Sequence, residues 1–146
     1  MTRSYLAAAL AAPVSIVMLL AGGSAAAQTD ADRGKREFLN SCAVCHGADA
    51  RGDGPLRPFL VRAPTNLTTI AKRHGGTFPT RQVMEMIDGR DTPRIGSHGT
   101  REMPVWGDVF LEQAQQDPRG AKMHPEWSVR ARIVALIDYL RRLQVD

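Results

Sequence analysis

The sequence predicts an all-α domain built from several short helices and connecting loops. Three observations point to this class. No stretch alternates apolar and polar residues for long enough to build a sheet, and the clearest apolar stripe, near the carboxyl end, has helical spacing. Clusters of glycine and proline separate the helical patterns from one another.

The first 27 of the 146 residues have the pattern of a secretory signal peptide. Arg3 is followed by an apolar run over residues 6–21 and by small residues that end at Ala27. The apolar run is short for a membrane-spanning helix. We expect residues 1–27 to be a signal peptide and residues 28–146 to form a single exported domain. The sequence leaves open whether the signal is cleaved or kept as an anchor.

The first predicted helix covers residues 29–41, where Thr29 and Asp32 can form a capping box. Gly34 lies inside this helix, and glycine there costs about 1 kcal/mol relative to alanine. That cost is tolerable where another helix backbone comes close. Residues 47–64, with three glycines and three prolines, are predicted to form a loop.

Two short helices should follow this loop. Asn66 can cap one that stops at Gly75, and Thr80 can cap another that stops before Gly89. The second helix is expected to turn three apolar side chains inward: Val83, Met84 and Ile87.

A second loop is predicted over residues 90–104, followed by a helix over 105–116 that Pro118 and Gly120 interrupt. The last helix starts at Pro125, which suits a first helical position, and continues to Leu143. Its apolar stripe has the spacing i, i+3, i+4, i+7 and consists of Ile133, Leu136, Ile137 and Leu140.

The two cysteines of the chain, Cys42 and Cys45, are followed directly by His46. C-x-x-C-H is the haem-attachment motif, in which two thioethers hold the porphyrin and the adjacent imidazole reaches the iron. A C-x-x-C dithiol oxidoreductase without haem is the alternative, but it needs a strand-to-helix context that the sequence does not predict. A zinc site would need four ligands, and no second C-x-x-C is present. The aromatic content of only 5% also favours a cofactor as a source of apolar volume in the core.

The order of several motifs resembles that of the class I c-type cytochromes, most closely the small bacterial single-haem members. The similarity extends from residue 29 to about residue 144. The segments that carry it are Gly34–Phe38, Cys42–Gly47, Gly52–Pro55, Met103–Pro104 and Leu136–Leu140. The resemblance implies a class I cytochrome c fold, with short helices and loops wrapped around one haem c attached through Cys42 and Cys45.

The same resemblance assigns the iron ligands. His46 corresponds to the proximal ligand, and a backbone carbonyl at Pro55 corresponds to the acceptor that orients its ring. Met103, in a proline- and glycine-rich loop, corresponds to the sixth ligand, which raises the reduction potential. His98 is the competing sixth ligand, and imidazole on both sides would lower the potential. The other methionines of the expected mature chain are less suited to ligation: Met84, Met86 and Met123.

These features predict an electron-transfer protein and not an enzyme. It would carry single electrons between periplasmic redox partners, either free or as the electron-accepting subunit of an oxidoreductase. The net charge of +4, or +3 without residues 1–27, favours partners with acidic docking surfaces. Scattered arginines do not indicate nucleic-acid binding, and no stable membrane insertion is expected after signal cleavage. A haem enzyme or gas sensor with an open iron position is the alternative.

Overall fold

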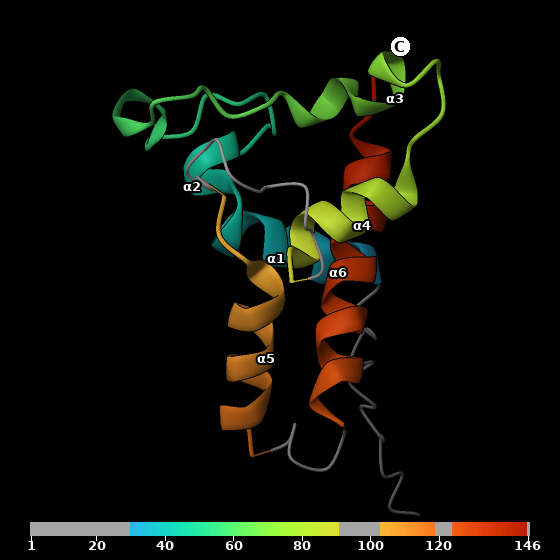
Figure 1. The fold of residues 1–146 in the computed structure, drawn as a ribbon. Helices are drawn as coiled ribbons and strands as arrows, with labels where there is room; N and C mark the ends of the chain where they lie inside the picture. The colour runs from blue at the N-terminus through green and yellow to red at the C-terminus, as the bar shows by residue number, and fades with distance from the viewer. Residues whose placement is uncertain (1–29, 91–102, 119–123, 146) are drawn as a thin grey trace, which may run out of the picture.

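The computed structural model describes residues 30–90, 103–118 and 124–145, and within these ranges it contains helices and loops but no strand. The all-α prediction is therefore confirmed (Figure 1). The elements in chain order are α1 (Asp30–Ser41), α2 (Ala43–His46), the 3-10 turns η1 (Arg57–Phe59) and η2 (Leu67–Thr69), α3 (Ile70–Arg73), α4 (Thr80–Asp88), α5 (Trp106–Gln116) and α6 (Pro125–Arg142). None of the described helices is both long and apolar enough to cross a membrane.

Helix α6 is the centre of the fold and packs against α1, α4 and α5 (Figure 1). Pro125 occupies its first turn, as predicted, where a missing N–H costs nothing. The predicted apolar stripe is buried, and burying a leucine or isoleucine side chain contributes roughly 1.5–3 kcal/mol. Arg141 and Arg142 lie in the last turn, where positive charge complements the helix dipole.

Helices α1 and α6 cross in close contact at Gly34. A Cβ atom built on Gly34 would lie 2.0 Å from the carbonyl oxygen of Ala135 and 2.9 Å from the Cβ of Tyr139. The buried ring of Phe38 packs beside this crossing, with its centroid 5.4 Å from that of Tyr139. The predicted role of Gly34 in a close helix approach is confirmed.

A half-buried ion pair joins the same two helices and extends to α5. The guanidinium of Arg132 donates to Glu37, with Nη2 2.7 Å from Oε1 and Nε 2.9 Å from Oε2. Its Nη1 donates to Gln113, and its carbon Cζ lies 3.8 Å from the ring centroid of Phe110. One arginine therefore links α1, α5 and α6.

The predicted caps at Asn66, Gly75 and Gly89 agree with the structure, and the predicted cap at Thr80 does not. Asn66 accepts a hydrogen bond from the Thr68 N–H at 2.9 Å, and Gly75 and Gly89 have φ of +66° and +72° at helix ends. The prediction that Thr80 caps α4 is wrong, because Thr80 is already its first helical residue. The N–H of Thr80 donates to the Phe78 carbonyl instead.

Several predictions fall outside the described residues. They concern the signal segment 1–27, the capping residue Thr29, the alternative ligand His98, the helix breaker Gly120 and the excluded ligand Met123.

Candidate functional site

The C-x-x-C-H motif forms the single helical turn α2 together with its N-cap residue Cys42, directly after α1 ends at Ser41. The N–H of Cys42 donates to the Phe38 carbonyl at 2.8 Å, which continues the end of α1. The N–H groups of Cys45 and His46 both donate to the Cys42 carbonyl, at 3.1 and 2.9 Å. This turn brings all three predicted attachment residues together. Both cysteines are free thiols and half-buried.

The environment of Cys42 disfavours dithiol redox chemistry. Burial is the main cause that raises the pKa of the Cys42 thiol to about 12, and the Glu37 carboxylate and Cys45 add smaller contributions. Reactive C-x-x-C cysteines instead have a lowered pKa, because the thiolate is the nucleophile. The neutral thiol of Cys42 does not match that requirement.

The ring of His46 is oriented by a backbone carbonyl. Its Nδ1 lies 3.0 Å from the carbonyl oxygen of Thr65. A carbonyl can only accept, so Nδ1 carries the proton and Nε2 keeps its lone pair. Burial lowers the pKa of His46, which outweighs the opposing effect of the Thr65 hydrogen bond. The imidazole is thus held neutral, with one nitrogen available as a metal ligand.

The carbonyl that contacts His46 belongs to Thr65 and not to Pro55, which corrects the sequence-based assignment. The loop around Pro55 is bound to the backbone of the motif instead, because the N–H groups on either side of it donate to carbonyls of the α2 turn. These bonds run from Gly54 to Cys45 at 3.1 Å and from Leu56 to Val44 at 3.0 Å.

The chain is fixed both before and after Thr65. On one side, Gly52 allows close approach of the chain before Thr65: a Cβ on Gly52, where φ is +87°, would lie 2.2 Å from the Pro64 carbonyl oxygen. On the other side, the amide of Gln144 accepts from the Ala71 N–H and donates to the Leu67 carbonyl, at 2.9 and 2.8 Å. Pro64 is the sequence signal for this contact, since it directly precedes Thr65, whose carbonyl the imidazole contacts.

Met103 is half-buried and packs against the hydrophobic core, three residues before α5 begins. Cys42, which directly follows α1, packs against the same core cluster. Met84 also packs there from within α4, whereas Met86 on the same helix is exposed. Of these three methionines, Met103 is the one in a non-helical segment.

The donor set fits a covalently attached haem. Two free thiols stand three residues apart, the neighbouring imidazole keeps Nε2 available, and a thioether lies on a loop segment. The segment after the motif also supplies apolar surface: Phe59 is 81% exposed and Val61 94% exposed. A large apolar macrocycle needs such neighbours.

An all-α domain with C-x-x-C-H in the turn after its first long helix has the organisation of a c-type cytochrome. The sequence matches the family described as Cytochrome c over residues 31–144, and the chain belongs to this family. Proteins of this family are generally electron-transfer proteins that carry covalently bound haem c. No curated protein and no solved structure gives a significant match.

Proposed function

We propose that this chain is a single-haem c-type cytochrome that carries single electrons between periplasmic redox partners. It works either as a free carrier or as the electron-accepting subunit of an oxidoreductase complex. The observation that carries the proposal is the motif turn itself, in which two free thiols lie beside an imidazole whose Nδ1 faces the Thr65 carbonyl.

Each residue of the site has a separate task. Cys42 and Cys45 would form the thioether bonds, His46 would present Nε2 to the iron, and Met103 would supply a thioether sulfur as the second protein ligand. When bound, the haem supplies an iron that changes between the ferrous and ferric states. The hydrogen bond at Nδ1 keeps the imidazole in one tautomer and one orientation, which raises its strength as a ligand.

Ligation by Met103 would determine the type of haem protein. With His46 and Met103 both bound to the iron, no iron position would be open for oxygen or peroxide chemistry, and the haem would supply electron transfer alone. A thioether ligand also raises the reduction potential relative to a second imidazole. A haem enzyme or gas sensor would instead require that position to be open.

Charge and targeting support the proposed partners and compartment. The loop that follows the motif carries three exposed arginines, Arg51, Arg57 and Arg62, and two exposed aspartates, Asp49 and Asp53. Its positive charge exceeds its negative charge by one, and the net charge of the whole chain is +4, which favours salt-sensitive encounter with acidic surfaces. The signal pattern of residues 1–27 supports export to the periplasm.

The attachment proposal is tested on full-length protein exported from a host that attaches haem to cytochromes. We expect a red protein whose pigment survives denaturing electrophoresis and acid extraction, and whose mass includes one haem. The Cys42→Ala, Cys45→Ala double variant should lose the covalent pigment. A colourless protein with two titratable thiols would support the dithiol alternative and refute haem attachment.

The ligand proposal is tested by carbon monoxide binding to the reduced protein. Wild type should resist carbon monoxide, and Met103→Ala should bind it readily because one iron position opens. Met84→Leu is the matched control, since it removes another half-buried sulfur from the same core. Ready binding by untreated wild type would refute the closed site and favour the enzyme or sensor.

A further inference from the structure

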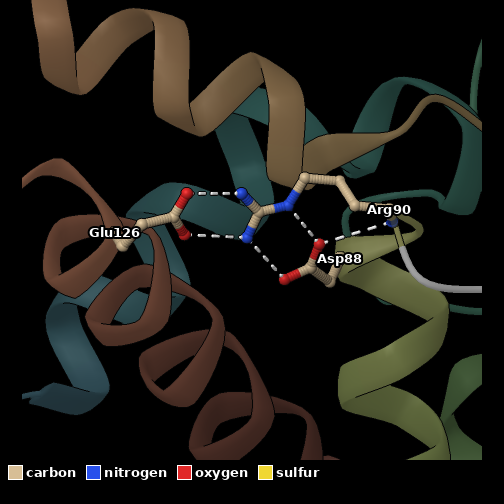
Figure 2. A network of polar contacts seen from close by, with 3 residues as sticks. All are labelled: Asp88, Arg90 and Glu126. Atoms are coloured by element: carbon tan, nitrogen blue, oxygen red, sulfur yellow. Dashed lines mark hydrogen bonds and ion pairs between the residues drawn. The ribbon is translucent and has the colours of Figure 1, made fainter.

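Arg90 lies just after the end of α4 and bridges carboxylates from two different helices (Figure 2). Its Nε and Nη2 donate to Asp88, at 2.6 and 3.0 Å. Its Nη1 and Nη2 donate to Glu126 of α6, at 2.8 and 3.0 Å. The planar guanidinium thus makes two forked pairs at once, a geometry that lysine cannot reproduce.

The start of α5 packs directly on this ion group. A Cβ atom built on Gly107 would lie 2.2 Å from Oδ1 of Asp88 and 2.5 Å from Nε of Arg90. The side chains of Arg90 and Asp88 are only 24% and 26% exposed, so solvent screens their interaction less than that of a surface pair. The contact therefore joins three elements, namely α4, α5 and α6.

The position of this contact in the chain gives it a consequence for Met103. Gly107 follows Met103 by four residues, so the segment 103–106 that carries Met103 has its base, the start of α5, on the Arg90 ion group. Glu126 connects this base to α6, which holds more buried apolar residues than any other described helix. Fixing the base of a short segment restricts where a side chain within it can go.

We propose that Arg90 is a positioning residue for the sixth ligand: by holding the base of this segment, it determines how firmly the Met103 sulfur stays on the iron. The inference rests on the proposed function, since it requires Met103 as the ligand. A thioether is a weak, neutral ligand, so its retention depends on how well the protein presents it. Arg90 acts through the backbone and does not touch the iron.

The test measures competition for the iron in the ferric holoprotein. Imidazole is a good metal ligand and displaces the thioether more easily when the segment is loosely held. We expect Arg90→Met and Arg90→Lys to bind imidazole about tenfold more tightly than wild type, which corresponds to about 1.4 kcal/mol. Spectral titration gives the dissociation constant, and the covalent haem content should remain unchanged.

Two controls separate positioning from general stability. Arg142→Met removes an arginine that is 61% exposed and pairs with Asp138 on α6, and it should leave imidazole affinity unchanged. Gly34→Ala destabilises the fold at the α1–α6 crossing, away from the base of the segment, and should also leave the affinity unchanged. If the Gly34 variant also binds imidazole more tightly, in proportion to its loss of stability as the Arg90 variants do, then Arg90 has only a structural role and the inference is wrong.

Failure of the inference is distinguishable from failure of the proposed function. Wild type that binds carbon monoxide, or that lacks the ferric spectrum of sulfur ligation, refutes Met103 as the ligand. Wild type with sulfur ligation, together with Arg90 variants that match the Arg142→Met control, refutes the positioning role alone.

Discussion

Replacing Gly34 by alanine tests how closely α1 and α6 must pack. The added methyl group would lie 2.0 Å from the carbonyl oxygen and 2.7 Å from the carbonyl carbon of Ala135. Both atoms belong to the helix backbone and cannot rotate away. Restoring normal contact requires a local separation of the helices by more than about 1 Å, since nonbonded carbon atoms prefer about 3.5–4.0 Å.

The expected effect is the difference of two terms. Alanine improves helix propensity by about 1 kcal/mol over glycine. Overpacking at a tight contact costs about 1–3 kcal/mol, and a rigid backbone neighbour places this site at the upper end. We therefore expect Gly34→Ala to lower the free energy of unfolding by about 2 kcal/mol, although alanine is the better helix former.

Urea unfolding of the holoprotein measures this change. The midpoint should fall while the dependence on urea stays constant, because the same surface is exposed on unfolding. Asn40→Ala, at an exposed position of the same helix, is the control and should change the free energy of unfolding by less than about 0.5 kcal/mol. A Gly34→Ala protein as stable as wild type, or more stable, would refute the packing argument.

Three further changes have defined outcomes. Arg132→Met should lower the free energy of unfolding by about 2 kcal/mol in urea titrations, because it leaves the Glu37 carboxylate, only 13% exposed, without its ion-pair partner; an unchanged midpoint contradicts this. The Arg90 hydrogen bond lowers the pKa of Asp88, so the ionised carboxylate stabilises the fold, and wild type should exceed Asp88→Asn in free energy of unfolding by the full amount at neutral pH. This advantage of wild type should disappear as the pH falls through the lowered pKa of Asp88. An advantage that persists in acid would show that packing, and not charge, causes it. Asn66→Ala removes the cap of η2 and should lower the free energy of unfolding by about 1 kcal/mol in the same urea assay. Asn66→Ser keeps a capping oxygen and should retain most of the wild-type stability.

Local patterns predicted the helices and the attachment motif because their causes lie within a few residues. The apolar stripe of α6, the glycines after α3 and α4, and the adjacent residues Cys45 and His46 are all short-range signals. The boundary at Thr80 was misjudged because both Pro79 and Thr80 are compatible with a helix start.

The partners of the site residues could not be predicted in the same way. Thr65 lies 19 residues from His46, and its carbonyl has no side-chain signature. Arg90 and Glu126 are 36 residues apart, and no local pattern distinguishes Arg90 from the other arginines. These contacts depend on how the helices pack, which residue spacing alone does not specify.

The pairing of the first and last described helices also determines when the native structure can form. Glu37 and Arg132 are 95 residues apart in the chain, so α1 lacks its main docking surface until α6 is present. Until the two helices pair, Cys42 and Cys45 lie on a chain whose first described helix is undocked, and both sulfur atoms are more accessible than in the folded domain, where they are half-buried.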